Sequence, residues 1–196
     1  TRADRPRPDV RRCRPHGDDP GSGAGPGAPD VMGAVLTESA LVEAVKRDRA
    51  SGLSIAFANG CFDLLHVGHL RYLTAAAGEA DRLIVAVNDD RSVADLKGPG
   101  RPILAESDRA ELVAALRVVD YVVLFPDRTV ERLLRLLTPD VHCKGTDYTI
   151  ESVPERAVVA AYGGRTAIVG DPKDHATRDL LARIADGLSG PPSRDR

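Results

Sequence analysis

The sequence predicts an α/β fold, in which a five-stranded parallel sheet carries helices on both faces of a single domain. Five short apolar runs are spaced along the chain, and segments with helical periodicity lie between them. The runs are nearly continuous in apolar residues, as in parallel strands that are buried on both faces. The chain has 196 residues, a length typical of one domain with room for a sizeable core.

The first half of the folded part alternates helix and strand twice. Thr37 is flanked by leucines that fit a hydrophobic staple around an N-cap, which predicts a helix over 37–50. The apolar run LSIAFA at 53–58 predicts a buried strand. A helix over 68–79 and a strand, RLIVAV, at 82–87 are predicted to follow.

The second half continues the alternation after a Gly- and Pro-rich loop, LKGPGRPI, at 96–103. The predicted elements are helix 106–117, strand 121–125, helix 129–137, strand 140–144, helix 153–163, strand 165–170 and helix 177–187. Such folds bind ligands at the carboxyl ends of their strands. The loops expected to carry function are therefore 59–68, 88–102, 144–152 and 170–177.

The two ends of the chain differ in composition from this region. Residues 1–31 are rich in Pro, Gly, Arg and Asp, and such a segment cannot bury much apolar surface. We therefore predict a disordered tail over 1–31, a folded domain over 32–188 and a second disordered tail over 189–196.

Composition and charge argue against several classes of protein. A net charge of −2 gives no electrostatic reason to expect nucleic acid or an anionic membrane as a partner. No apolar run approaches the roughly 20 residues of a membrane helix, and no signal-peptide pattern opens the sequence. Cys13, Cys61 and Cys143 are scattered, which argues against a disulfide framework or a zinc site and favours a reduced, cytoplasmic compartment.

The segment NGCFDLLHVGHLRYL at 59–73 holds the strongest functional signal. Gly68 stands where a helix is predicted to begin, and a glycine there lets a ligand approach free backbone amides, which attract phosphate. His66 and His69 flank this point and can donate imidazole N–H groups to the same anion. A zinc site is disfavoured because H-x-x-H alone supplies only two ligands. The sequence contains neither G-x-G-x-x-G after the first strand nor a P-loop.

Further polar residues stand at the same predicted edge. Lys97 lies in the Gly- and Pro-rich loop and Lys144 at a strand end, where an ammonium group could reach phosphates. The chain has only four lysines beside many arginines, so a lysine at these places is informative. Asn88 and Asp89 end the second predicted strand, where a ribose or acceptor hydroxyl could bind, although a simple turn is an equal alternative.

The motif GCFDLLHVGH resembles the G-x-F-D-x-x-H-x-G-H signature of the cytidylyltransferase-like nucleotidyltransferases. The resemblance extends over about residues 53–185 and implies a Rossmann-like, doubly wound domain. The segments VNDDRSVADLKGPGRPI, DRAELVAALRVVDYVVLF, PDVHCKGTDYTIESVPE and YGGR are similar to those of D-glycero-β-D-manno-heptose 1-phosphate adenylyltransferases. Those enzymes join the sugar 1-phosphate to ATP and release pyrophosphate. The resemblance therefore implies ATP and a sugar 1-phosphate as substrates, Mg²⁺ bound mainly through the nucleotide phosphates, no metal ligands from side chains alone, and a homodimer.

The resemblance also assigns roles to residues. The catalytic residues it implies are His66, His69, Lys97 and Lys144. The nucleotide would be bound by these histidines and by Asn59, Gly60, Cys61, Phe62, Asp63, Gly68, Arg109 and Thr177. The acceptor would be bound by the two lysines and by Asp147 and Tyr148, to which the strand-end residues Asn88 and Asp89 are added from their position.

One departure from the family pattern bears on the choice of nucleotide. Related enzymes carry a Ser-Thr pair where the last helix begins, and this chain has Ala176 and Thr177. Glycerol-phosphate cytidylyltransferases carry Arg-Thr-x-Gly-Ile-Ser-Thr-Thr there, and this chain has GDPKDHATR, which weakens a CTP-dependent function. Two alternatives stay open: transfer from CTP to glycerol 3-phosphate or another alcohol phosphate, and a nucleotide-binding protein without catalytic activity.

Overall fold

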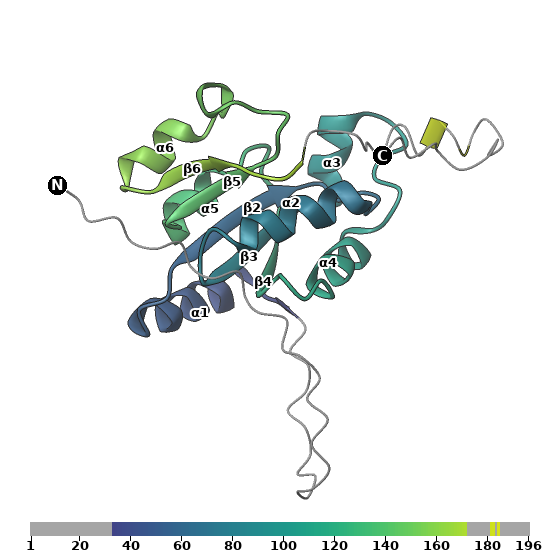
Figure 1. Ribbon diagram of the computed structural model, residues 1–196. Helices are drawn as coiled ribbons and strands as arrows, with labels where there is room; N and C mark the ends of the chain where they lie inside the picture. The colour runs from purple at the N-terminus through teal and green to yellow at the C-terminus, as the bar shows by residue number, and fades with distance from the viewer. Residues whose placement is uncertain (1–32, 172–180, 183, 185–196) are drawn as a thin grey trace, which may run out of the picture. The chain divides into compact units, whose positions relative to one another are not determined.

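The computed structural model describes residues 33–171, 181–182 and 184, and it confirms the α/β fold with a parallel sheet. Six parallel strands lie in the order β1-β4-β3-β2-β5-β6 (Figure 1). The strands are β1 (Ala34–Val35), β2 (Ile55–Gly60), β3 (Arg82–Asn88), β4 (Tyr121–Phe125), β5 (Val141–Lys144) and β6 (Arg165–Ile168). The helices are α1 (Glu38–Ala50), α2 (Val67–Ala77), α3 (Asp90–Lys97), α4 (Glu106–Ala114), α5 (Glu131–Leu137), the 3₁₀ helix η1 (Ile150–Ser152) and α6 (Arg156–Ala161).

Side chains alternate between the two faces of the sheet, and helices cover both (Figure 1). Ala56 and Ala58 of β2 point into a core closed by α2 and α4, whose Leu73 and Val113 are fully buried. On the opposite face, β2 contributes to a core closed by α1, α5 and α6. Burial on both faces explains why the predicted strands are nearly continuous apolar runs.

The sheet has one strand more than the five that the sequence predicts. The additional strand, β1, has two residues, and Ala34 and Val35 pair with Tyr121 and Val122 of β4. Gly33 precedes it, and a Cβ there would stand 2.7 Å from the carbonyl oxygen of Val119, so the close approach to the segment before β4 requires glycine. A two-residue strand with exposed side chains has no hydrophobic period to detect.

A second difference lies in the loop predicted over 88–102. Residues 90–97 form α3, and the side chain of Asp89 caps it by accepting a hydrogen bond of 2.7 Å from the amide of Ser92. The Gly- and Pro-rich loop begins only after the helix, at Gly98, whose φ of 90° ends it. Asp89 is therefore a helix cap in this structure.

Parts of the prediction lie outside the described residues. These are the two tails, 1–31 and 189–196, and most of the helix predicted over 177–187, of which residues 181, 182 and 184 are helical. Thr177 and Ala176 belong to the same undescribed stretch. Within the described residues, no helix is both long enough and apolar enough to cross a membrane.

Candidate active site

The site lies where the strand order reverses. Without β1, the order β4-β3-β2-β5-β6 follows the chain as third, second, first, fourth and fifth strand, the doubly wound order of a Rossmann fold. The chain leaves β2 toward β3 on one side and later returns to β5 on the other. Ligands bind outside the carboxyl ends of the strands at such a point, where β2 and β5 end in Gly60 and Lys144.

The two histidines of the motif are fixed at the start of α2. His66 is the N-cap, and its Nδ1 accepts from the amide of Gly68 at 3.1 Å. His69 Nδ1 accepts from the amide of His66 at 3.4 Å, and the two rings stack with centroids 3.9 Å apart. Because Nδ1 is an acceptor in both rings, the proton of each neutral imidazole lies on Nε2. The motif thus presents two neighbouring N–H donors.

The environment keeps His69 neutral. Burial, the neighbouring His66 and the positive charge of Lys97 together lower the pKa of His69 from 6.5 to about 4. The ring edge of Phe62 packs against His69 with centroids 5.3 Å apart. Phe62 has a φ of 47°, and a Cβ at Gly60 would lie 3.2 Å from its ring, so the turn after β2 is tightly constrained.

Lys97 and Lys144 occupy different environments. Lys97 is the exposed last residue of α3, and its charge reaches His69 and also opposes the rise that burial causes in the pKa of Cys61. Lys144 is only 7% exposed. Its Nζ lies 3.0 Å from Asn59 Oδ1, 3.3 Å from a carboxylate oxygen of Glu155 and 5.4 Å from the ring centroid of Tyr148.

Asp63 and Arg109 hold the loop that follows α3. Asp63 accepts hydrogen bonds from Arg101 at 2.5 Å and from the amide of Ile103 at 2.6 Å, and these bonds outweigh burial and lower its pKa. Arg109 is fully buried, and its guanidinium donates to the carbonyls of Leu104, Cys61 and Asn88 and to the carboxylate of Asp90. These contacts give both residues a positioning role, and direct nucleotide contact by either stays a prediction.

The remaining predicted acceptor residues fall into two groups. Asn88 is buried and donates to Ser92 Oγ at 3.2 Å, while Asp89 caps α3, so both are engaged at the start of that helix. Asp147 and Tyr148 are exposed beyond the end of β5. The structure thus brings Tyr148 and Asn59 together around Lys144, and it engages Asn88 and Asp89 in local structure.

Sequence reasoning missed three residues of this region. Arg101 pairs with Asp63, His142 shares Asn59 Oδ1 with Lys144, and Glu155 pairs with Lys144. Glu155 stands eleven positions after Lys144, across a loop and η1, so no local pattern links the two. His142 occupies a core position in a strand and is fully buried.

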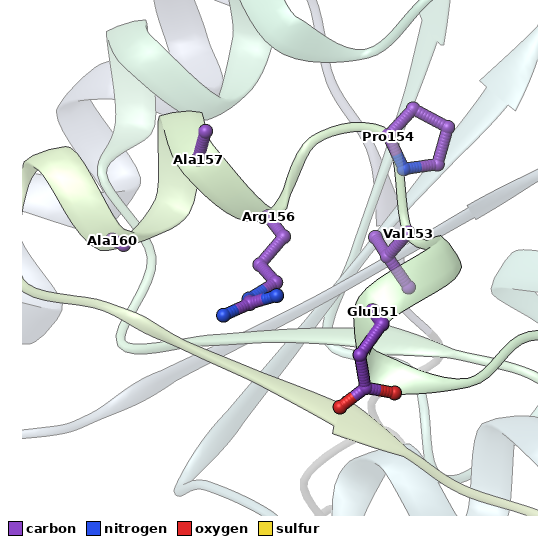
Figure 2. A pocket seen from close by; sticks show the side chains of 6 residues that line it. All are labelled: Glu151, Val153, Pro154, Arg156, Ala157 and Ala160. Atoms are coloured by element: carbon purple, nitrogen blue, oxygen red, sulfur yellow. The ribbon is translucent and has the colours of Figure 1, made fainter.

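A cavity of about 320 Å³ lies at η1 and the start of α6, and none of the predicted site residues lines it. It is lined by Glu151, Val153, Pro154, Arg156, Ala157 and Ala160. Figure 2 shows the side chains of Glu151 and Arg156 extending into the space between η1 and α6. In the described part of the chain, no three His, Cys, Asp or Glu side chains form a group that could hold a metal ion.

The family model described as Cytidylyltransferase-like matches residues 57–182, which include the whole histidine motif and both site lysines. The chain belongs to the cytidylyltransferase-like family. It is accordingly a nucleotidyltransferase.

Relatives within this nucleotidyltransferase family share more than the motif. The chain is 47% identical to the bifunctional protein HldE of Pseudomonas fluorescens over 150 residues. The aligned region covers 76% of this chain and 32% of that protein. It is 50% identical over 139 residues to HldE of Rhodopseudomonas palustris, covering 71% and 28%. The chain therefore spans about a third of the length of the curated relatives that it matches.

A solved structure supports the same assignment. The lipopolysaccharide core biosynthesis protein of Thermoplasma volcanium is 27% identical, with a TM-score of 0.54 over 62% of this chain and the whole of that one.

Proposed function

We propose that this nucleotidyltransferase joins D-glycero-β-D-manno-heptose 1-phosphate to ATP and forms ADP-heptose and pyrophosphate. One observation carries the proposal: His66 and His69 each accept a backbone amide at Nδ1, can donate from Nε2, and lie near Lys97 at the switch point of the sheet. The similarity to HldE proteins over 150 residues supports the heptose 1-phosphate acceptor.

The chemistry requires alignment and charge stabilisation more than acid–base catalysis. An oxygen of the acceptor phosphate attacks the α-phosphorus of ATP, a new P–O bond forms, and the bond to the bridging oxygen of pyrophosphate breaks. The second pKa of a phosphate monoester is about 6, so the nucleophile is already ionised at neutral pH. Negative charge develops on the leaving pyrophosphate, and fixed donors lower the barrier when they point at that charge.

The described residues supply such donors. His66 and His69 would donate their Nε2–H groups to the triphosphate, and the low pKa of His69 keeps that ring neutral near pH 7. Lys97 would neutralise the outer phosphates and Lys144 the acceptor phosphate. Asp63 and Arg109 would hold the loop 98–105 that follows Lys97. Mg²⁺ would enter as part of the MgATP substrate, because the described residues offer no group that could hold it alone.

A second function is favoured by the family description itself. A cytidylyltransferase acting on glycerol 3-phosphate or another alcohol phosphate would use the same mechanism with CTP. A nucleotide-binding protein without activity is the lesser alternative. A cytoplasmic location stays a prediction from the scattered cysteines, and a homodimer stays a prediction from the family resemblance.

The decisive experiment measures pyrophosphate release with Mg²⁺ for ATP and CTP, each with heptose 1-phosphate or glycerol 3-phosphate. Activity with ATP and the heptose phosphate alone would support the proposal. Activity with CTP and glycerol 3-phosphate would support the second function, and binding without release would support the third.

The variants His66→Ala and His69→Ala should lower kcat by about 10²–10³-fold each, the usual cost of removing one preorganised donor to the transition state. Lys97→Ala should weaken nucleotide binding. Lys46→Ala is the matched control, because this exposed lysine on α1 pairs only with Glu43 among the described contacts.

A further inference from the structure

Lys144 and Glu155 form an ion pair that is almost removed from water. The residues are 7% and 5% exposed, and Lys144 Nζ lies 3.3 Å from Glu155 Oε2 and 3.5 Å from Oε1. Lys144 ends β5, and Glu155 immediately precedes α6. The pair therefore joins the carboxyl edge of the sheet to the start of α6.

The side chain of Glu155 does not cap α6. The residue is the N-cap residue of α6, yet its side chain makes no capping hydrogen bond. The carboxylate turns toward Lys144, and Oε2 is buried without a hydrogen-bond donor in addition to the ion pair. A buried ion pair is rarely better for stability than apolar side chains of similar size, so stability alone does not account for this arrangement.

The ammonium of Lys144 is under opposing influences. Burial lowers its pKa, and the carboxylate of Glu155 offsets only part of that effect, so that the pKa stays below its usual value. The other groups around Lys144 carry no negative charge that would stabilise its ammonium. Asn59 is neutral, and the ring of Tyr148 lies 5.4 Å away. His142 is also neutral, because burial lowers its pKa to about 3. Asp147 is exposed on the loop that follows β5.

We propose that Glu155 is a positioning residue for the acceptor phosphate, which keeps Lys144 charged and aimed at the carboxyl edge of β5. The inference rests on the proposed function, because it assigns the acceptor phosphate to Lys144. Glu155 itself does not touch the substrate. It acts through Lys144, and its negative charge, not its shape, is what the site requires.

The test compares Glu155→Gln with Glu151→Gln. Both change a glutamate to its isostere in the same segment, but Glu151 is exposed on η1. In Glu155→Gln, the KM for the acceptor should rise by at least about tenfold, the effect of misplacing one charged hydrogen bond, while the KM for ATP stays within about twofold. The alkaline limb of kcat/KM should move to lower pH. Glu155→Asp, which retains the charge, should recover part of the loss.

A second readout does not depend on activity. The chain has four lysines, so NMR of ¹³C-methylated lysines, with Lys144→Arg for assignment, can follow the Lys144 titration directly. Lys144 should be charged at pH 7 in the wild-type protein and should titrate at lower pH in Glu155→Gln. An uncharged Lys144 in the wild type, or an identical titration in the variant, would overturn the proposal.

The two readouts separate the two hypotheses. A wild-type protein that makes ADP-heptose while Glu155→Gln keeps its acceptor KM would refute the inference and leave the function intact. An inactive wild type with the predicted Lys144 titration would refute the proposed function and retain the effect of Glu155 on Lys144. A Glu155→Gln protein that does not fold leaves the wild-type titration and Glu155→Asp as the tests.

Discussion

Burial sets the charge of the histidines on both sides of β2. His69 lies in the first turn of α2 at the carboxyl edge of the sheet, whereas His142 is buried in β5 with its Nε2 3.3 Å from Asn59 Oδ1. Burial lowers the pKa of both, to about 4 and about 3. The same physical cause thus keeps both rings neutral, one at the carboxyl edge of the sheet and the other in its core.

The low pKa of His142 predicts how stability depends on pH. An unfolded histidine takes up its proton near 6.5, whereas folded His142 does so at about 3. Between these values the unfolded chain binds more protons, so the free energy of unfolding falls as the pH falls. The loss from this residue should be about 2 kcal/mol between pH 7 and pH 5.

The variant His142→Gln tests this, because glutamine retains an N–H donor for Asn59 but does not titrate. Urea unfolding at pH 7 and pH 5 should show a drop that is about 2 kcal/mol smaller in the variant than in the wild type. Equal drops in the two proteins would refute the assignment of a neutral His142.

At the scale of elements, the loop 98–105 is fixed by buried groups from outside it. Asp63, in the turn after β2, accepts hydrogen bonds from Arg101 and Ile103, and Arg109 of α4 donates to the carbonyl of Leu104. The loop also contains a cis peptide bond between Arg101 and Pro102. Lys97 is thereby held between a capped helix, α3, and an anchored loop.

Asp63→Asn should loosen this loop. The change removes the charge that pairs with Arg101 and leaves one of the donors around it without an acceptor. This loss should lower the free energy of unfolding by about 1–3 kcal/mol. Hydrogen exchange of the Ile103 and Leu104 amides should accelerate, and the KM for ATP should rise by about tenfold. Asp108→Asn, an exposed residue of α4, is the control. Unchanged exchange at Ile103 would contradict the anchoring role.

The elements also mark the limit of what the sequence predicts. The five longer strands are predictable because burial on both faces requires continuous apolar runs, and the histidine motif is predictable because its residues are neighbours in the chain. Helix α3 is not predicted from the sequence, because it buries only Ser92 and Val93 and precedes a Gly- and Pro-rich stretch. The roles of Glu155 and Arg101 are not predicted either, because their partners, Lys144 and Asp63, are distant in sequence and come close only in the folded protein.

Across the whole sheet, the two edges are built for different tasks. At the amino edge, three aspartates satisfy backbone amides where strands begin: Asp81 accepts from Ser54, Asp120 from Leu83 and Asp140 from Ile55. At the carboxyl edge lie the histidines and lysines for which we propose phosphate binding. Stability and ligand binding should therefore respond to substitutions at opposite ends of the same strands.

Asp140→Ala and Lys97→Ala test this division. Asp140 Oδ2 accepts from the amide of Ile55 at 2.8 Å, and Ile55 is fully buried, so the alanine variant leaves a buried donor unsatisfied. That should cost about 1–3 kcal/mol in urea unfolding, whereas Lys97→Ala, at an exposed position, should stay within about 0.5 kcal/mol of the wild type.

The rise in melting temperature caused by MgATP should show the reverse order, because ligand stabilisation depends only on affinity for the folded state. Asp140→Ala should keep the full rise, and Lys97→Ala should lose most of it. A reduced rise in Asp140→Ala would mean that the amino edge takes part in binding and that the two tasks are not separated along the strands.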